Sequence, residues 1–101
     1  MKAKKITFKE SLNREKCITF FIRYGYFVHT EDDQILVMRK AGSQLTVDGE
    51  KFPKELSIFF KSNETEIALK YNTFVLFDTG DLQEELDVIS NRIKTNINSL
   101  V

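Results

Sequence analysis

The residues that could carry chemistry in this chain are few and far apart. Cys17 is the only cysteine and His29 the only histidine, so a nucleophilic pair of cysteine and histidine would consist of these two residues. Cys17 stands among Ile18, Phe20 and Phe21, where a free cysteine usually behaves as a small, inert core residue. We therefore expect no catalytic residue and a protein that is not an enzyme.

Two charged segments could serve as binding sites. The run from Glu31 to Asp33 lacks the ligand spacing and the glycine of a calcium loop, and it is predicted to be a hairpin turn. No metal site and no cofactor are expected. Lysines at positions 2, 4, 5 and 9 form a basic arm that would favour a phosphate backbone. Fifteen basic residues balance fifteen acidic ones, however, so nucleic-acid binding is kept only as an alternative.

A third pattern lies where a long apolar run ends. Asp78-Thr79-Gly80 follows Val75-Leu76-Phe77, and this resembles the active-site motif of aspartic proteases. That family has Ser or Ala after the glycine, where this chain has Asp81, and most of its β-structure follows the motif. Here residues 81–101 read as a helix. The segment is therefore interpreted as a structural turn, with Asp78 or Asp81 capping the helix and Gly80 adopting an unusual φ.

Composition predicts a single small domain spanning residues 1–101. Of its 101 residues, 42% are hydrophobic, and nine Phe and three Tyr offer the large buried area that a small core needs. One cysteine excludes a disulfide within the chain. No apolar stretch is long enough to span a membrane, and no apolar segment of a signal peptide follows the basic start. A cytoplasmic location without membrane association is expected.

The elements that would position any site can be read from periodicity. Residues 4–9 alternate weakly and are predicted to be a short first strand. A helix is predicted from near Leu12, capped by Ser11 or Asn13 and ended by Gly25. Strands are predicted at residues 26–30, 35–40, 44–47, 55–61 and 65–77, with a possible hairpin signal at 48–49 and a possible bend at 72–73.

The last predicted element is a helix that starts near Asp81 and runs to the end of the chain. Asp81 and Glu84 have the spacing of a capping box, with Asp in place of Ser or Thr. An apolar stripe at spacings of three and four follows, and it is the clearest periodicity in the sequence. Its members are Leu82, Leu86, Ile89, Ile93, Ile97 and Leu100.

These elements predict an α+β fold in the order (β)-α-β(4–5)-α. An antiparallel meander of four to six strands would pack against an N-terminal helix and a long C-terminal helix. The order is similar to that of the TATA-binding and Bet v 1-like folds, in which one curved sheet packs against two helices. This similarity concerns topology alone, and such folds carry many functions.

The predicted strands are apolar on both faces, which an antiparallel sheet with one wet face should not be. Either the two helices cover opposite faces, or both cover one face and leave an apolar patch that marks an interface or a ligand site. The second arrangement suits a chain of this length. The predicted interaction surface consists of Leu36, Met38, Phe59, Phe74 and Leu76.

Three functions remain open from the sequence. The preferred one is a non-enzymatic protein–protein interaction module, which forms a homodimer or binds another protein through the apolar sheet face. The second is a small-molecule or lipid-binding domain, with an aromatic-lined cavity between the sheet and the C-terminal helix and a small apolar ligand in it. The third is a nucleic-acid-binding regulator that uses the N-terminal lysines.

Overall fold

The computed structural model describes residues 3–42, 53–73, 75 and 80–101. Within them the chain forms an α+β fold whose five strands are antiparallel and lie in one sheet, in the order β1-β5-β4-β3-β2. Strands β2 to β5 form the predicted meander, and β1 adds to it beside β5. The bounds are β1 Lys4–Phe8, α1 Arg14–Ile22, β2 Tyr26–Glu31, β3 Ile35–Lys40, β4 Lys54–Phe60, β5 Thr65–Tyr71, α2 Asp81–Thr95 and α3 Ile97–Leu100.

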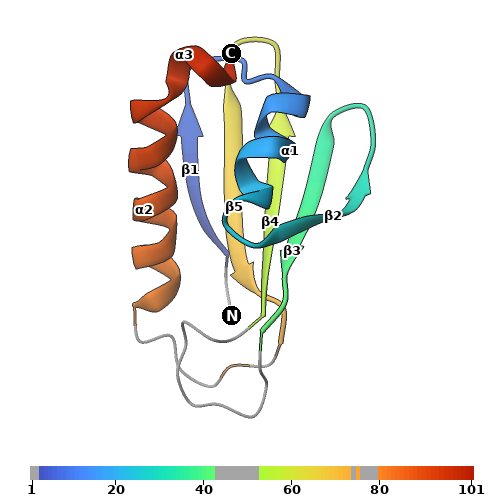
Figure 1. The fold of residues 1–101 in the computed structure, drawn as a ribbon, viewed down its shortest axis with the longest axis vertical. Coiled ribbons are helices and arrows are strands. Elements are labelled where there is room, and N and C mark those ends of the chain that lie inside the picture. Colours follow the sequence, from blue (N-terminus) through green and yellow to red (C-terminus); the bar gives the residue numbers. More distant parts are fainter. Residues whose placement is uncertain (1–2, 43–52, 74, 76–79) are drawn as a thin grey trace.

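Helices α1 and α2 pack on the same face of the sheet. Helix α2 contacts β1 and β5, whereas α1 contacts β2, so each helix covers a different half of that face. Figure 1 shows α1 in front of the strands and α2 beside β1, with α3 following α2 at the end where the chain terminates. The domain therefore has two layers, which decides between the two arrangements that the sequence allowed.

The core lies between these layers. Helix α1 contributes Cys17, Phe20 and Phe21, and the predicted stripe of α2 is buried as expected from Leu82 to Ile93. From the sheet come the alternate residues that point towards the helices. They are Phe8, Tyr26, Leu36, Met38, Leu56, Ile58, Ile67, Leu69 and Tyr71.

Local signals in the sequence mark several element ends. The Asn13 side chain accepts a hydrogen bond from the Lys16 amide, so Asn13 is the cap of α1. Gly25, just beyond that helix, has φ +88°, a value that suits glycine. In the β2–β3 turn, Oδ1 of Asp32 accepts hydrogen bonds from the amides of Gln34 and Ile35, which lower the pKa of the Asp32 carboxyl.

The C-terminal helix differs from the prediction because it is not continuous. It breaks at Asn96, which has φ −109° and whose amide and side chain both donate to the Arg92 carbonyl. The chain then turns into α3, where Leu100 is buried and its carbonyl accepts a hydrogen bond from the Asn13 amide. Because of this break, the last two residues of the apolar stripe, Ile97 and Leu100, lie on α3, which packs against α1.

The strand predicted for residues 65–77 is described only in part. β5 ends at Tyr71, and the chain bends at Asn72 and Thr73, where the sequence indicated a possible bend; residues 74, 76 and 77 lie outside the described residues. The predicted strand at 44–47 and the hairpin signal at 48–49 lie outside the described residues. No helix in the described part of the chain is long and apolar enough to cross a membrane.

Candidate functional site

The face of the sheet that points away from the helices is the first candidate site, and we call it the open face. Because residues paired across strands point to the same side, its side chains form three rows across the sheet. The first row is Thr7, Glu66, Phe59 and Ile35, the middle row is Lys5, Ala68, Ser57, Val37 and Thr30, and the third row is Lys70, Glu55, Arg39 and Phe27. No element of the described ranges packs over this face.

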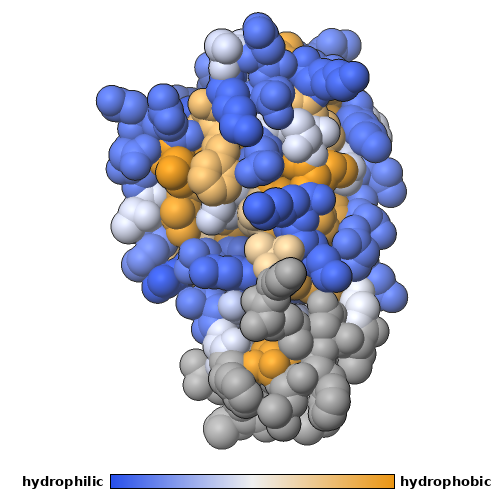
Figure 2. Space-filling view, turned by 180° about the vertical axis from the view of Figure 1, so that it is seen from behind, coloured by the Kyte–Doolittle hydropathy of each residue, from blue (hydrophilic) through white to orange (hydrophobic). Residues whose placement is uncertain are grey.

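Apolar side chains occupy the centre of the open face. Ile35, Val37 and Phe59 are neighbours on β3 and β4 and are only half-buried, and Phe27 on β2 is 50% exposed. Figure 2 views the molecule from behind and shows apolar surface among the hydrophilic side chains of this face. Small side chains, Ser57 and Ala68, lie beside this apolar group.

Charged side chains of both signs surround that centre. In the third row, Glu55 pairs with Arg39 at 3.2 Å and with Lys70 at 3.7 Å. Glu66 lies in the first row, four residues before Lys70 on the same strand, and Lys5 lies on the edge strand β1. The open face is therefore apolar at its centre and carries both positive and negative charge around it.

The structure separates the residues that were predicted to form the interaction surface. Phe59 lies on the open face, but Leu36 and Met38 are fully buried under the helices, so their assignment to the same surface was wrong. The reason is register: Ile35 pairs with Phe59, which places Leu36 on the opposite face. Phe74 and Leu76 lie outside the described residues.

The turn before α2 agrees with the prediction in one respect and differs in another. Gly80 has φ +95°, the unusual backbone conformation that was expected there. Gly80, and not Asp81, is the N-terminal cap, because Asp81 is already the first residue of the helix. Asp81 and Glu84 lie in the first turn, where acidic side chains favour the positive end of the helix dipole. Asp78 lies outside the described residues.

The second candidate site is a polar cluster on the helix side of the sheet. Oε1 of Glu85 lies 3.4 Å from Nζ of Lys54, and Oε2 lies 3.5 Å from Nζ of Lys40. The Tyr26 hydroxyl donates a hydrogen bond to Oε2. Nζ of Lys40 also lies 5.3 Å from the centre of the Tyr26 ring. One carboxylate from α2 thus joins side chains from β2, β3 and β4.

The chemistry of this cluster is that of a structural contact. Burial raises the pKa of the Tyr26 hydroxyl, and the negative charge of Glu85 and the hydrogen bond to it raise that pKa further. The phenol therefore stays protonated and donates, and it cannot serve as a base. Lys54 is fully buried, and the Glu85 carboxylate 3.4 Å away compensates its positive charge.

A groove of about 410 Å³ lies beside this cluster, between α2 and the β2–β3 side of the sheet. Tyr24 and Tyr26 line it together with Lys40, Val88 and Arg92. The Arg92 guanidinium lies 4.8 Å from the centre of the Tyr24 ring and donates to its hydroxyl at 2.8 Å. This groove is an aromatic-lined space between the sheet and the C-terminal helix.

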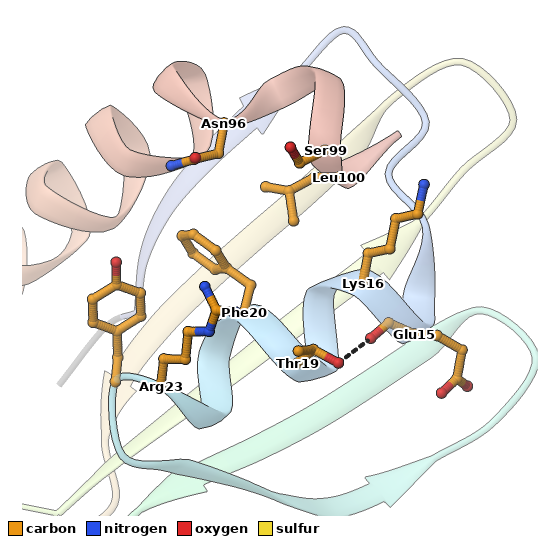
Figure 3. Close-up of a pocket in the computed structure, with 9 residues that line it drawn as sticks. Glu15, Lys16, Thr19, Phe20, Arg23, Asn96, Ser99 and Leu100 are labelled. Carbon is orange, nitrogen blue, oxygen red and sulfur yellow. Dashed lines mark hydrogen bonds between the residues drawn. The ribbon is translucent and has the colours of Figure 1, made fainter.

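A second groove, of about 470 Å³, lies between α1 and α3. Figure 3 shows Phe20 and Leu100 facing each other across it, while Glu15 points away. The Thr19 hydroxyl donates to the Glu15 carbonyl at 3.2 Å, as drawn there. Tyr24 lines both grooves, so its contact with Arg92 lies at the border between them.

The two residues weighed as a nucleophilic pair lie in different environments. Cys17 is 1% exposed in the core, and burial raises the pKa of its thiol to about 12. His29 is exposed and sits where the pairing of β2 with β3 is irregular. In the ranges that the structure describes, no three His, Cys, Asp or Glu side chains form a group that could hold a metal ion.

Sequence reasoning missed the cluster around Glu85, although two signals pointed to it. Lys54 is in phase with Leu56 and Ile58 along β4, which places it on the buried face. Glu85 directly precedes Leu86 and flanks the apolar stripe of α2. A buried lysine needs an anionic partner to compensate its charge, but the sequence alone does not identify which acidic residue is that partner.

Comparisons with known proteins add no assignment. No protein-family model, no curated protein and no solved structure matches the chain.

Proposed function

We propose that this protein is a non-enzymatic interaction module that forms a homodimer through its open face. The supporting observation is that both helices lie on one side of a sheet whose other side carries neighbouring apolar residues at its centre. Exposed apolar groups that adjoin one another and are rimmed by polar residues are typical of protein interfaces. Burying Ile35, Val37 and Phe59 would remove apolar area from water.

The charges around this centre favour a second copy over a partner of different chemistry. A surface with one sign of charge selects a partner with the opposite sign. The open face carries Lys5, Arg39 and Lys70 together with Glu55 and Glu66, so it offers both signs itself. A two-fold dimer brings the same patch of both subunits together, and such a patch must be complementary to itself.

The test is the mass of the protein in solution as a function of concentration. We expect a dimer by sedimentation equilibrium, and a monomer when Val37 or Phe59 is replaced by Asp, because each substitution puts a charge in the apolar centre. Ile22→Asp is the matched control, since Ile22 is 55% exposed at the end of α1. Circular dichroism checks that each variant is folded.

Three results would contradict the proposal. The first is a wild-type protein that stays monomeric at every concentration. The second is a pair of folded variants, Val37→Asp and Phe59→Asp, that keep the mass of a wild-type dimer. The third is a dimer that Ile22→Asp disrupts while the two sheet variants leave it intact, because the contact would then lie on the helix side.

A second function is supported by the groove between α2 and the sheet. Tyr24, Tyr26, Val88 and Ile89 give it apolar surface, and charged side chains make up the rest of the lining, a combination that suits a small molecule with both polar and apolar parts. Native mass spectrometry of freshly purified protein tests it. A discrete extra mass that Val88→Glu removes would support a ligand in this groove, whereas bare protein, or an adduct that persists in the variant, would count against it.

A further inference from the structure

The arrangement of charge on the open face restricts how two copies can stack. In face-to-face packing of two sheets, the strands of the two layers usually run within about 30° of each other. Two kinds of two-fold axis in the plane of contact satisfy this. One runs along the strands and the other across them, and they bring different rows of side chains together.

An axis along the strands, centred on β4, would keep each row opposite itself and exchange β3 with β5. The third row would then place Arg39 of one copy over Lys70 of the other, because these residues flank Glu55 on either side. Glu55 would face the other copy's Glu55. Like charges that meet across an interface oppose association, so an axis at this position on β4 is unfavourable.

An axis across the strands, passing near Ser57, gives the opposite outcome. Each strand stacks over its own copy, and the first row exchanges with the third. On β5 this brings Glu66 of one copy over Lys70 of the other, twice in each dimer, since both residues lie two positions from Ala68 on either side. Opposite charges then meet at two symmetric places.

The centre of the middle row also suits this axis. It would pack Val37 against Val37 and Ala68 against Ala68, with Ser57 at the centre, and it would place Lys5 on the edge strand over Lys5 of the other copy. Ser57 and Ala68 have small side chains, which lets the two sheets approach closely. Phe59 would lie over Glu55 of the other copy, whose carboxylate is paired with Arg39 at 3.2 Å.

We propose that the dimer is a face-to-face stack of the two sheets about a two-fold axis that crosses the strands near Ser57 and pairs Glu66 with Lys70 of the other copy. This inference rests on the proposed function, because it requires the open face to be the dimer contact. It adds the relative orientation of the subunits and the charge pair that selects it.

The experiment is a charge exchange, read as the dimer dissociation constant by sedimentation equilibrium. Glu66→Lys places two lysines opposite each other at both symmetric sites, and we expect the dissociation constant to rise about tenfold. Lys70→Glu places two acids together and should weaken the dimer likewise. The double variant restores opposite charges, so its dissociation constant should return to within about threefold of the wild type.

Controls keep this test specific. Glu10→Lys and Lys94→Glu make the same charge changes at exposed positions away from the open face, and we expect neither to alter the dissociation constant. Lys70→Glu also meets Glu55 of its own copy, so thermal unfolding is measured for every variant. The double variant carries the same Lys70→Glu change, so its unfolding midpoint is compared with that of Glu66→Lys before their dissociation constants are compared.

The outcomes separate the two proposals. If Val37→Asp gives a monomer but Glu66→Lys has no effect, or the double variant is no tighter than the single ones, the axis is wrong and the open face remains the contact. If the wild type is a monomer at all concentrations, both proposals fail. Rescue by the double variant, with neutral controls, supports the axis.

Discussion

The ammonium group of Lys54 lies 3.4 Å from Oε1 of Glu85, and the Lys54 side chain is completely buried. The two residues come from different layers, β4 and α2, and are 31 positions apart in the sequence. An isolated charge is costly inside a protein, and this pair fixes the position of α2 over the sheet. Removing the two partners should therefore have unequal effects.

We expect Glu85→Ala to destabilise the protein by about 2–4 kcal/mol, because it leaves Lys54 buried without its carboxylate and removes the acceptor of the Tyr26 hydroxyl. Lys54→Met should change the free energy of unfolding by less than about 1 kcal/mol, since Glu85 keeps Lys40 and Tyr26. Urea unfolding measures both. Glu84→Ala, one position earlier on the exposed side of α2, is the control. Equal losses of unfolding free energy for Glu85→Ala and Lys54→Met would show that the uncompensated charge of Lys54 is not the cause of the destabilisation by Glu85→Ala.

Cys17 makes stability depend on pH in the alkaline range. Burial raises the pKa of its thiol from 9.0 to about 12. Between these values the thiol ionises in the unfolded chain but not in the native protein, so its contribution is complete below pH 9 and is lost as the pH rises towards 12. The free energy of unfolding should fall in this window, with a slope that approaches about 1 kcal/mol per pH unit from this group.

The measurement is a comparison with Cys17→Ala in urea at several pH values. The variant is less stable at neutral pH because it loses buried volume, and the difference from the wild type should shrink as the pH rises from 9 to 12. A constant difference over this range would contradict the assignment. Below pH 9, iodoacetamide should modify the thiol only on unfolding, because the native side chain is 1% exposed.

Thr65 on β5 forms hydrogen bonds with the segment between β1 and α1. Its buried hydroxyl donates to the Glu10 carbonyl at 2.9 Å and accepts from the Leu12 amide at 3.0 Å. Thr65→Val keeps the shape and removes both bonds, so it should cost about 1–3 kcal/mol. Hydrogen exchange should accelerate at the Leu12 amide first. Thr7→Val, at an exposed position of β1, should change neither quantity.

The backbone at the start of α2 has a positive φ at Gly80, a conformation that favours glycine. This φ is +95°, and a Cβ added there would meet no atom of the described residues within 4 Å, so the backbone conformation is what would penalise a side chain. Gly80→Ala should therefore cost about 1–2 kcal/mol, and Gly80→Asn less, because Asn tolerates positive φ better. Thermal unfolding measures the loss. Equal midpoints for wild type and Gly80→Ala would mean that the turn relaxes to a negative φ.

Features that depend on neighbouring residues were predictable from the sequence. The Asn13 cap, the Asp32 turn, the positive φ of Gly80 and the apolar stripe of α2 each follow from side chains a few positions apart. The class of fold follows as well, because the alternation of the strands and the period of the helices show which segments must pack together. The break at Asn96 was missed because the apolar stripe continues across it.

Only the tertiary structure decided which side chains share a surface. Alternation shows that Leu36 and Ile35 point to opposite sides of β3, but it does not show which of them meets Phe59, because the register between strands is set by contacts far apart in the sequence. The same holds for Lys54 and Glu85, which packing brings together from β4 and α2. The amino-acid sequence determined the elements and their apolar faces; the pairing register and the placement of both helices on one face determined what is buried and what remains open for a partner.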